Sequence, residues 1–281
     1  MTGVRMAVFD LDGTLLSHGA LTGKAISMLR ALKRNGVLVV IATGRHRGTV
    51  PLRLQSSRLT DYLLCSNGAV VTPAKGAPLL ENALTGADLA DLMALGAPFG
   101  CRYAVSLGRS TFLSRKEPLL RRKTDGGGDT RKFFWRYYMY PLHSRVVESW
   151  AAFLRRPNAR AEKVVCTPAR PGDEEAFRAA VAKDGRFEAT GAAQAAEITA
   201  CGVSKGSALA LLARRLNVPR EAIVAFGNDD NDLSLKAHAG RFVAARESSP
   251  AALRAADEVA DSIPAAARRL CLPKEKGAAS L

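Results

Sequence analysis

Residues 37–42 form an unbroken apolar run, Val-Leu-Val-Val-Ile-Ala, in which most side chains are β-branched. A strand of this composition is typically buried on both faces, as in a parallel sheet covered by helices on either side. Shorter apolar runs at 4–9 and 62–65 lie before and after it, and a helical pattern that begins near Thr22 separates the first two runs. This alternation predicts an α/β fold with a doubly wound, Rossmann-like parallel sheet.

Each of the three predicted strands is followed by small or acidic polar residues, which begin at Asp10, Thr43 and Ser66. In open α/β sheets, ligands bind in the crevice beyond the carboxyl ends of the strands. We therefore expect the functional site at this edge of the sheet.

The chain of 281 residues is 47% hydrophobic and 24% charged, which is typical of a globular protein and excludes a disordered, fibrous or membrane-spanning one. Its longest uncharged stretch, 62–74, is too short to cross a bilayer, and no secretory signal precedes the first apolar run. The five cysteines show no paired spacing and indicate reduced thiols. We therefore expect a cytoplasmic protein that does not bind a membrane.

The middle of the chain differs from its two ends. It is richer in arginine, it contains the loop sequence Asp-Gly-Gly-Gly-Asp at 125–129, and residues 132–140 hold six of the 17 aromatic side chains in a pattern typical of a strand. Strands and helices alternate again in the last third. We predict a core domain formed by 1–81 and 188–281, with an inserted α+β domain at 82–187.

The net charge is high, with 41 Lys and Arg against 26 Asp and Glu, which gives +15. Residues 102–136 carry ten bases and three acids. Such a patch attracts anions, either phosphorylated metabolites or nucleic acid. The plainer interpretation is a solvated basic face, so the charge alone favours no nucleic-acid partner but leaves one open.

Asp10 and Asp12 follow the first strand and are separated by one residue, so their side chains leave the strand end on the same side. Gly13 then permits a tight turn. Two neighbouring carboxylates repel each other unless a cation lies beside them, and Mg²⁺ suits such a pair because it leaves room for a phosphate group. One carboxylate could attack phosphorus and the other could act as general acid and base.

These residues resemble the first motif of the haloacid dehalogenase superfamily, Asp-x-Asp-Gly-Thr, and three later segments match the remaining motifs in order. Thr43-Gly44-Arg45 resembles the second motif, Glu197 with the segment 202–206 resembles the third, and 227–232 resembles the acidic fourth. The position and length of the insert are similar to the Cof-like branch, which carries an α/β cap there.

The resemblance implies a Mg²⁺-dependent phosphatase that acts on a small phosphorylated metabolite, such as a sugar phosphate or cofactor phosphate, through an aspartyl-phosphate. Asp10 would be the nucleophile and Asp12 the general acid and base. The phosphate would be bound by the Leu11 amide, Thr43, Gly44, Lys205 and Asn231. The metal would be bound by Asp10, Asp12, Asn228 and Asp232.

The fourth motif departs from the family pattern at Asn228, where the family usually has a metal-binding aspartate. An amide oxygen can bind Mg²⁺ but adds no negative charge. A shift by one residue that brings Asp229 to the metal is the alternative, although it would displace Asn231.

Two other functions fit the same residues. One is a catalytically weak protein of this fold that binds a polyanion such as RNA through the basic insert. The other is a phosphotransferase that passes the phosphoryl group to an alcohol. The natural substrate and the oligomeric state do not follow from the sequence.

Arg45 and His46 are of interest because they lie beside the predicted phosphate-binding loop.

Overall fold

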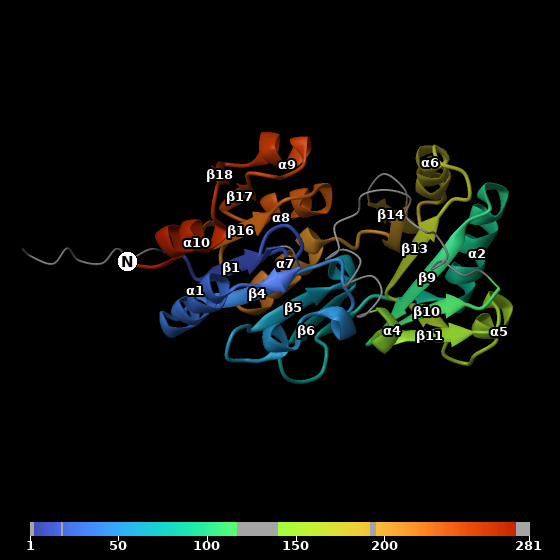
Figure 1. Ribbon diagram of the computed structural model, residues 1–281, viewed down its shortest axis with the longest axis horizontal. Coiled ribbons are helices and arrows are strands. Elements are labelled where there is room, and N and C mark those ends of the chain that lie inside the picture. The colour runs from blue at the N-terminus through green and yellow to red at the C-terminus, as the bar shows by residue number, and fades with distance from the viewer. Residues whose placement is uncertain (1–2, 18, 117–139, 192–194, 274–281) are drawn as a thin grey trace, which may run out of the picture.

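A computed structural model describes residues 3–17, 19–116, 140–191 and 195–273, and Figure 1 shows two sheets side by side along its long axis. The predicted strand at 132–140 lies outside these residues except for its last position. The larger sheet has eight strands in the order β18-β17-β16-β1-β4-β5-β6-β7. Their bounds are β1 Met6–Phe9, β4 Leu38–Ala42, β5 Tyr62–Cys65, β6 Val70–Pro73, β7 Leu80–Glu81, β16 Ile223–Gly227, β17 Arg241–Ala245 and β18 Glu258–Ala260.

The larger sheet is parallel except at one edge. β1 pairs in parallel with β4 and β16, and the parallel pairing continues outward to β5 on one side and to β17 and β18 on the other. β6 and β7 add antiparallel pairs. Numbered along the chain, the parallel strands have the order 3-2-1-4-5-6, which confirms the predicted doubly wound class. The order reverses between β1 and β16, and ligands bind beyond the strand ends at such a point.

Helices bury both faces of this sheet, which explains its apolar strands. In β1, Ala7 and Phe9 belong to a core cluster that also holds buried residues of α1 (Gly23–Arg34) and α10 (Ile263–Cys271). Met6 and Val8 belong to the opposite cluster, which includes residues of α7 (Lys205–Arg215) and α8 (Leu233–Lys236). Successive side chains of a strand point to opposite faces, so every position of β1 is apolar.

The smaller sheet has six strands in the order β11-β10-β9-β13-β15-β14. Their bounds are β9 Arg102–Leu107, β10 Ser110–Ser114, β11 Ser144–Val147, β13 Lys163–Thr167, β14 Phe187–Thr190 and β15 Ala196–Ala200. One face packs Tyr103, Val105 and Val164 in a core cluster that also contains buried residues of α2 (Gly86–Gly96), α5 (Trp150–Leu154) and α6 (Glu174–Asp184). The opposite face is the more polar one and carries Ser106 and Lys163 next to Ala104 and Val165.

The remaining elements are short. Two-stranded pairs join β2 (Leu16–Ser17) to β3 (Ala20–Leu21) and β8 (Leu84–Thr85) to β12 (Arg160–Ala161). The other helices are α4 Tyr140–His143, α9 Pro250–Ala255, η1 Arg47–Thr49, η2 Leu52–Gln55, η3 Ser66–Gly68, η4 Ala97–Phe99, η6 Arg220–Ala222 and η7 Asp230–Asp232. Within the ranges that the structure describes, none of the helices has the length and apolar character needed to cross a membrane.

The strand pairings bear on the domain limits expected from the sequence. The first limit, between residues 81 and 82, coincides with the end of β7. The second, between 187 and 188, falls inside β14, and both β14 and β15 pair within the smaller sheet. A local pattern identifies a strand but not the distant strand with which it pairs. We therefore revise the second limit and propose that the insert spans 82–200 and the core 1–81 with 201–281.

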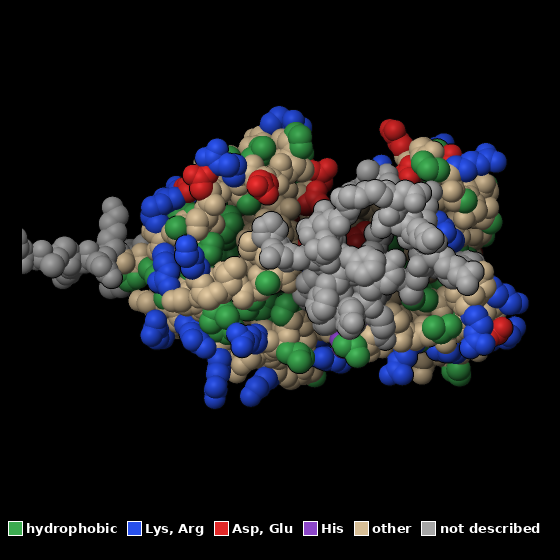
Figure 2. All heavy atoms as spheres, viewed as in Figure 1, with side chains coloured by type: hydrophobic (Ala, Val, Ile, Leu, Met, Phe, Trp, Pro, Cys, Tyr) green, Lys and Arg blue, Asp and Glu red, His purple; other side chains and the backbone are tan. Residues whose placement is uncertain are grey.

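Figure 2 shows the basic surface on one face of the molecule. Lys and Arg side chains are spread along the edges of both the core and the insert rather than gathered in a single cluster, and Asp and Glu occur among them mainly on the upper side of this view. Among the side chains that the structure describes on this face, the positive charge is therefore diffuse. Most of the basic stretch 102–136 lies outside the described residues.

Candidate active site

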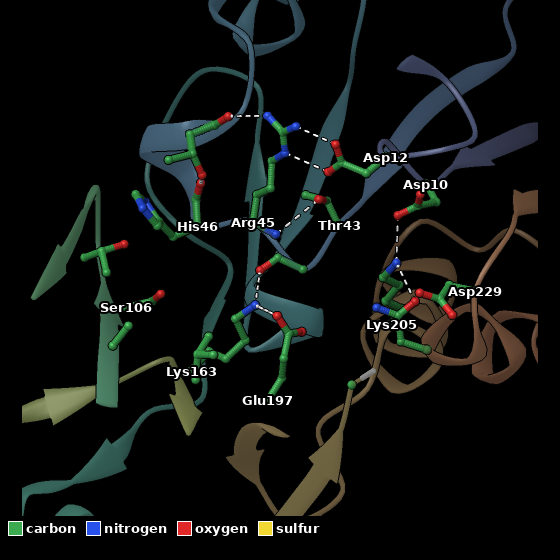
Figure 3. Close-up of a pocket in the computed structure, with 17 residues that line it drawn as sticks. Asp10, Asp12, Thr43, Arg45, His46, Ser106, Lys163, Glu197, Lys205 and Asp229 are labelled. Atoms are coloured by element: carbon green, nitrogen blue, oxygen red, sulfur yellow. Dashed lines mark hydrogen bonds and ion pairs between the residues drawn. The ribbon is translucent and has the colours of Figure 1, made fainter. Parts of the chain in front are cut away.

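A pocket of about 450 Å³ lies at the carboxyl edge of the larger sheet, where the polar face of the smaller sheet covers it (Figure 3). The core contributes six of the nine predicted site residues and some of their neighbours to its wall, namely Asp10, Asp12, Thr43, Gly44, Arg45, His46, Thr49, Lys205, Asp229 and Asn231. The predicted residues Leu11, Asn228 and Asp232 do not line it. The insert contributes Ala104, Ser106, Thr111, Lys163, Val165, Gly191 and Glu197. The structure thus brings residues from both ends of the chain and from the insert into one pocket.

Asp10 lies at the end of β1, next to the point where the strand order reverses. Its backbone N–H donates to the carbonyl of Phe226 at 2.9 Å, and the rings of Phe9 and Phe226 stack with centroids 4.7 Å apart just before the strands end. The Asp10 side chain is buried, and the chain leaves it through a turn in which Gly13 has φ = +84°. Packing between β1 and β16 therefore fixes the position of this carboxylate.

Lys205, the first residue of α7, places a fully buried ammonium group beside Asp10. Its Nζ donates to Asp10 Oδ1 at 2.8 Å, to Asp232 Oδ1 at 2.7 Å and to Asn231 Oδ1 at 3.2 Å. Ser204 caps the helix by accepting from the backbone N–H of Ser207. The side chain of Lys205 is 1% exposed, so its three N–H groups are satisfied by these oxygens rather than by water.

Burial and charge act in opposite directions on this pair. Burial raises the pKa of Asp10 to about 7, against the opposing effect of Lys205. Burial lowers the pKa of Lys205, but the carboxylates of Asp10 and Asp232 outweigh it and hold that pKa above its usual value. Lys205 is therefore charged at neutral pH, whereas Asp10 needs a further positive charge nearby to remain fully ionised.

The second carboxylate, Asp12, is half-exposed and bound by Arg45. Arg45 Nε donates to Asp12 Oδ2 at 2.7 Å, and a terminal nitrogen donates to Asp12 Oδ1 at 2.5 Å. The other terminal nitrogen of Arg45 donates to the carbonyl of Thr49 at 2.9 Å. Two parallel bonds fix the plane of the carboxylate as well as its position. The sequence drew attention to Arg45 only through its place beside Thr43-Gly44.

Three of the predicted phosphate-binding residues, Leu11, Thr43 and Gly44, follow the ends of β1 and β4. Thr43 is buried, and its Oγ1 accepts the backbone N–H of Arg45 at 3.1 Å, which leaves the hydroxyl proton for a ligand. A side chain at Gly44 would bring a Cβ to 2.9 Å from Asn67 Oδ1, so the loop needs glycine there. Leu11 is fully buried, so only its backbone could bind phosphate. Asn231 lines the pocket beside Lys205.

Asn228 contacts the first motif rather than the open pocket. Its Oδ1 accepts from the hydroxyl of Thr14 at 2.8 Å, and the same position lies 2.8 Å from the carbonyl of Asp12 and 3.2 Å from Asp10 Oδ2. With the amide turned over, nitrogen occupies that position and donates to these oxygens. Gly13 is required here too, since a Cβ on it would lie 2.5 Å from Asn228 Nδ2.

With its oxygen in that position, Asn228 completes a set of hard oxygen donors. Two oxygens that bind one Mg²⁺ at about 2.1 Å in octahedral geometry lie about 3.0 Å apart. The amide position of Asn228 lies 2.8 Å from the carbonyl of Asp12 and 3.2 Å from Asp10 Oδ2, so this donor set is compatible with Mg²⁺ when the amide turns its oxygen, rather than its nitrogen, toward them. It contains one carboxylate, one amide and one backbone carbonyl. In the described ranges, no group of three or more His, Cys, Asp or Glu side chains could hold a metal ion.

Asp232 and Asp229 do not join this set of oxygens. Asp232 Oδ1 accepts from Lys205, and Asp232 Oδ2 accepts the backbone N–H groups of Asn228 at 2.9 Å and Asp229 at 3.1 Å. With both oxygens bound, this buried carboxylate orients Lys205 and the loop, and we revise the sequence expectation that it binds metal. Asp229 lines the pocket and caps η7 by accepting from the N–H of Asp230.

The sequence did not single out Lys163 of the insert. Its buried Nζ donates to the carbonyl of Gly44 and to Glu197 Oε1, both at 2.6 Å. Glu197 Oε2 also accepts from the amide of Asn67 at 2.7 Å. Burial raises the pKa of Glu197, but Lys163 outweighs it, and the pKa lies below its usual value. An isolated lysine in a strand gives no sequence signal, because its partners come from distant segments.

Comparisons with known proteins identify the family to which the sequence is similar. A family model described as haloacid dehalogenase-like hydrolase matches residues 7–266. Proteins named HMP-PP phosphatase from Yersinia pseudotuberculosis and Yersinia pestis are 28% identical over 250 residues, which cover 84% of this chain and 82% of theirs.

Solved structures show the same fold. A haloacid dehalogenase-like hydrolase from B. subtilis superposes with a TM-score of 0.82 at 21% identity, covering 95% of this chain and 99% of its own. The subclass IIB sugar phosphatase BT4131 superposes with a TM-score of 0.75 at 20% identity, covering 95% and 98%. The predicted core with an inserted cap is thereby confirmed as the architecture.

Proposed function

The chain belongs to the haloacid dehalogenase-like hydrolases and is a phosphatase of that family, and on this premise we propose that it hydrolyses a small phosphorylated metabolite through an aspartyl-phosphate at Asp10. The observation that carries the proposal is the contact of 2.8 Å between the Asp10 carboxylate and the Lys205 ammonium in a pocket that also contains Asp12. A volume of about 450 Å³ supports a small substrate.

The proposed reaction has two halves. Asp10 attacks phosphorus, its oxygen forms a new bond to phosphorus, and the bond from phosphorus to the leaving oxygen breaks while Asp12 donates a proton to that oxygen. Asp12 then removes a proton from water, the water oxygen attacks phosphorus, and the Asp10 carboxylate is released. Arg45 would act as a positioning residue, because its two hydrogen bonds orient Asp12.

Positive charge must balance the phosphoryl oxygens while phosphorus is transferred. We propose that the Lys205 ammonium, the hydroxyl of Thr43, the amide of Asn231 and the backbone N–H groups of Leu11 and Gly44 bind these oxygens. Asp232 keeps Lys205 in place through the contact of 2.7 Å. Lys205 is held by Asp10, Asp232 and Asn231 before the substrate binds and would exchange one of these hydrogen bonds for a phosphoryl oxygen.

We further propose a Mg²⁺ ion held by Asp10 Oδ2, the carbonyl of Asp12 and Asn228 Oδ1. When bound, the ion would supply positive charge to the phosphoryl oxygens and favour the ionised form of Asp10. The distances of the Asn228 amide position from the Asp12 carbonyl and from Asp10 Oδ2, 2.8 and 3.2 Å, support this assignment.

The test is phosphate release from p-nitrophenyl phosphate and a panel of phosphorylated metabolites, with Mg²⁺ and with EDTA. We expect Asp10→Asn to lower kcat by roughly a thousandfold or more, since the nucleophile is lost. Asp91→Asn, an exposed acid of α2 in the insert, is the matched control and should keep full activity. Activity that survives both EDTA and Asp10→Asn contradicts the proposal, and phosphate transfer to an added alcohol in preference to water would indicate the phosphotransferase.

A further inference from the structure

The half of the pocket away from Asp10 is built on one face of the smaller sheet. Across three neighbouring strands, Thr111 pairs with Ser106 and Ser106 pairs with Lys163. The next row on the same face pairs Ala104 with Val165. All five residues line the pocket. A substrate bound to Asp10 would therefore direct its leaving group toward two hydroxyl groups and two small apolar side chains.

The cations in this half of the pocket have partners within the protein. Lys163 is bound by Glu197 and by the carbonyl of Gly44, and Arg45 is bound by Asp12 and by the carbonyl of Thr49. The carboxylates of Glu197 and Asp12 already balance the charges of these two cations, so a second anionic group on the substrate would gain little from them. The arrangement of the described residues thus favours an uncharged leaving group.

His46 lies in this half of the pocket, and Figure 3 shows it on the same side as Ser106, away from Lys205. Its side chain is 4% exposed, and its Nδ1 accepts the backbone N–H of Gly48 at 3.1 Å. An imidazole whose Nδ1 accepts a hydrogen bond carries its proton on Nε2. The fold therefore fixes the tautomer of this histidine.

Burial, together with the charges of His143 and Lys163, lowers the pKa of His46 to about 4, so the ring is neutral at physiological pH. Its Nε2 is buried and has no hydrogen-bond partner among the residues that the structure describes. A buried donor without an acceptor is unfavourable, and native proteins rarely keep one unless it has a function. An acceptor supplied by the substrate would complete the hydrogen bond.

We propose that His46 is a specificity-determining residue whose Nε2–H donates to the oxygen of an uncharged hydroxyl group on the leaving group. The leaving group would then lie against Ser106 and Thr111. This inference rests on the proposed phosphatase function and narrows it to monoesters of a hydroxylated alcohol.

Two substitutions separate this role from a purely structural one. Asn in place of His46 can keep an oxygen near the Nδ1 position, where it accepts from Gly48 and caps η1, but it has no donor near Nε2. Gln in place of His46 reaches the Nε2 position with an N–H donor but does not reproduce the cap. The two variants therefore each retain one of the two hydrogen-bonding functions.

The experiment compares kcat/KM for phenyl phosphate, whose ring has no acceptor, with kcat/KM for glycerol 3-phosphate, ribose 5-phosphate and glucose 6-phosphate. In the wild type, we expect at least one hydroxylated ester to be preferred. His46→Asn should lower kcat/KM for that ester roughly tenfold, mainly through KM, and change phenyl phosphate less than about twofold. His46→Gln should retain more of the preference than His46→Asn does.

Three results would overturn the inference while leaving the phosphatase function intact. In the first, the wild type shows no preference for a hydroxylated ester. In the second, His46→Asn lowers kcat/KM equally for all substrates. In the third, His46→Asn keeps the wild-type preference for the hydroxylated ester while His46→Gln loses it. Thermal unfolding of both variants establishes that they are folded. Absence of activity on every ester in the wild type would instead overturn the proposed function, and this inference with it.

Discussion

The buried charges around Lys205 show how one side chain can serve both stability and catalysis. Its ammonium lies between Asp10 and Asp232, and all three groups are at most 8% exposed. Removing one partner of a buried ion pair leaves an uncompensated charge, which typically costs about 3–5 kcal/mol. Asp232 allows Lys205 to remain bound when Asp10 is consumed in the proposed phosphoenzyme. We infer that this second carboxylate is the reason a fully buried lysine is tolerated here.

Asn228 leads to a prediction about metal affinity. The oxygens that we assign to Mg²⁺ include one carboxylate, so Asn228→Asp adds a negative charge where the amide oxygen now lies, 2.8 Å from the carbonyl of Asp12. We expect the Kd for Mg²⁺ to fall by about tenfold or more, equivalent to about 1.4 kcal/mol, and this can be measured by isothermal titration calorimetry. Without metal, the new carboxylate would repel Asp10 and lower Tm.

The control for this variant is Asn158→Asp, which makes the same change of charge at an exposed position of the insert. It should leave both the Kd for Mg²⁺ and the metal-free Tm near the wild-type values. An unchanged or weaker Mg²⁺ affinity in Asn228→Asp would show that residue 228 does not bind the ion.

At the scale of elements, the strands β1, β4 and β5 could be predicted from sequence, because burial on both faces leaves a local apolar signature. The polar residues after these strands were predicted to meet at one edge. Those after β1 and β4, Asp10 and Thr43 among them, line one pocket, whereas Ser66 after β5 does not. This part of the prediction depended on strand direction alone. It did not require knowledge of any side-chain contact.

The insert was harder to predict for a physical reason. The membership of β14 and β15 in the smaller sheet depends on pairing with β13. Lys163 and Glu197 become site residues only because this pairing places them opposite Gly44 and Asn67. Such contacts join segments far apart in the chain and have no local pattern.

Glu162, between β12 and β13, leads to a prediction about pH. Its carboxylate is buried, accepts from Ser66 at 2.8 Å and from the N–H of Gly108 at 2.7 Å, and thus joins the core to the β9–β10 turn. Burial raises its pKa. Between its ordinary pKa, near 4.5, and its raised value in the folded protein, the folded state holds more protons than the unfolded state, so this group's contribution to stability falls as pH rises.

Glu162→Gln imitates the protonated form at every pH, because its amide can donate to Ser66 and accept from Gly108. We expect the free energy of unfolding of this variant, relative to the wild type, to increase as pH rises from 4.5 toward 7. Urea unfolding at several pH values measures it. Glu148→Gln, at an exposed ion pair, is the control. Parallel pH profiles for Glu162→Gln and the wild type would contradict the prediction.

At the scale of the whole molecule, the core and the insert enclose the pocket through contacts that surround it. Lys163 binds the carbonyl of Gly44 and Ser66 binds Glu162, so both phosphate-loop and strand-end segments of the core contact the smaller sheet. The η1 segment also packs closely on the β9–β10 turn, because a Cβ on Gly48 would lie 2.2 Å from the carbonyl oxygen of Arg109. The contact between the core and the insert therefore depends on close backbone packing as well as on hydrogen bonds made by charged side chains.

Gly48→Ala tests whether this closed arrangement is the active one. The added methyl group would collide with the backbone of Arg109, which cannot move as a flexible side chain would, and overpacking of this kind typically costs about 1–3 kcal/mol. We expect the insert to move away from the core, with kcat/KM reduced roughly 5- to 100-fold for phenyl phosphate as well as for hydroxylated esters. The loss of kcat/KM on phenyl phosphate distinguishes Gly48→Ala from His46→Asn.

Small-angle scattering of Gly48→Ala should show an increased radius of gyration. The control is Gly23→Ala, where a Cβ meets nothing within 4 Å, and it should change neither kcat/KM nor the radius of gyration. Wild-type kcat/KM and an unchanged radius in Gly48→Ala would mean that catalysis does not require this contact.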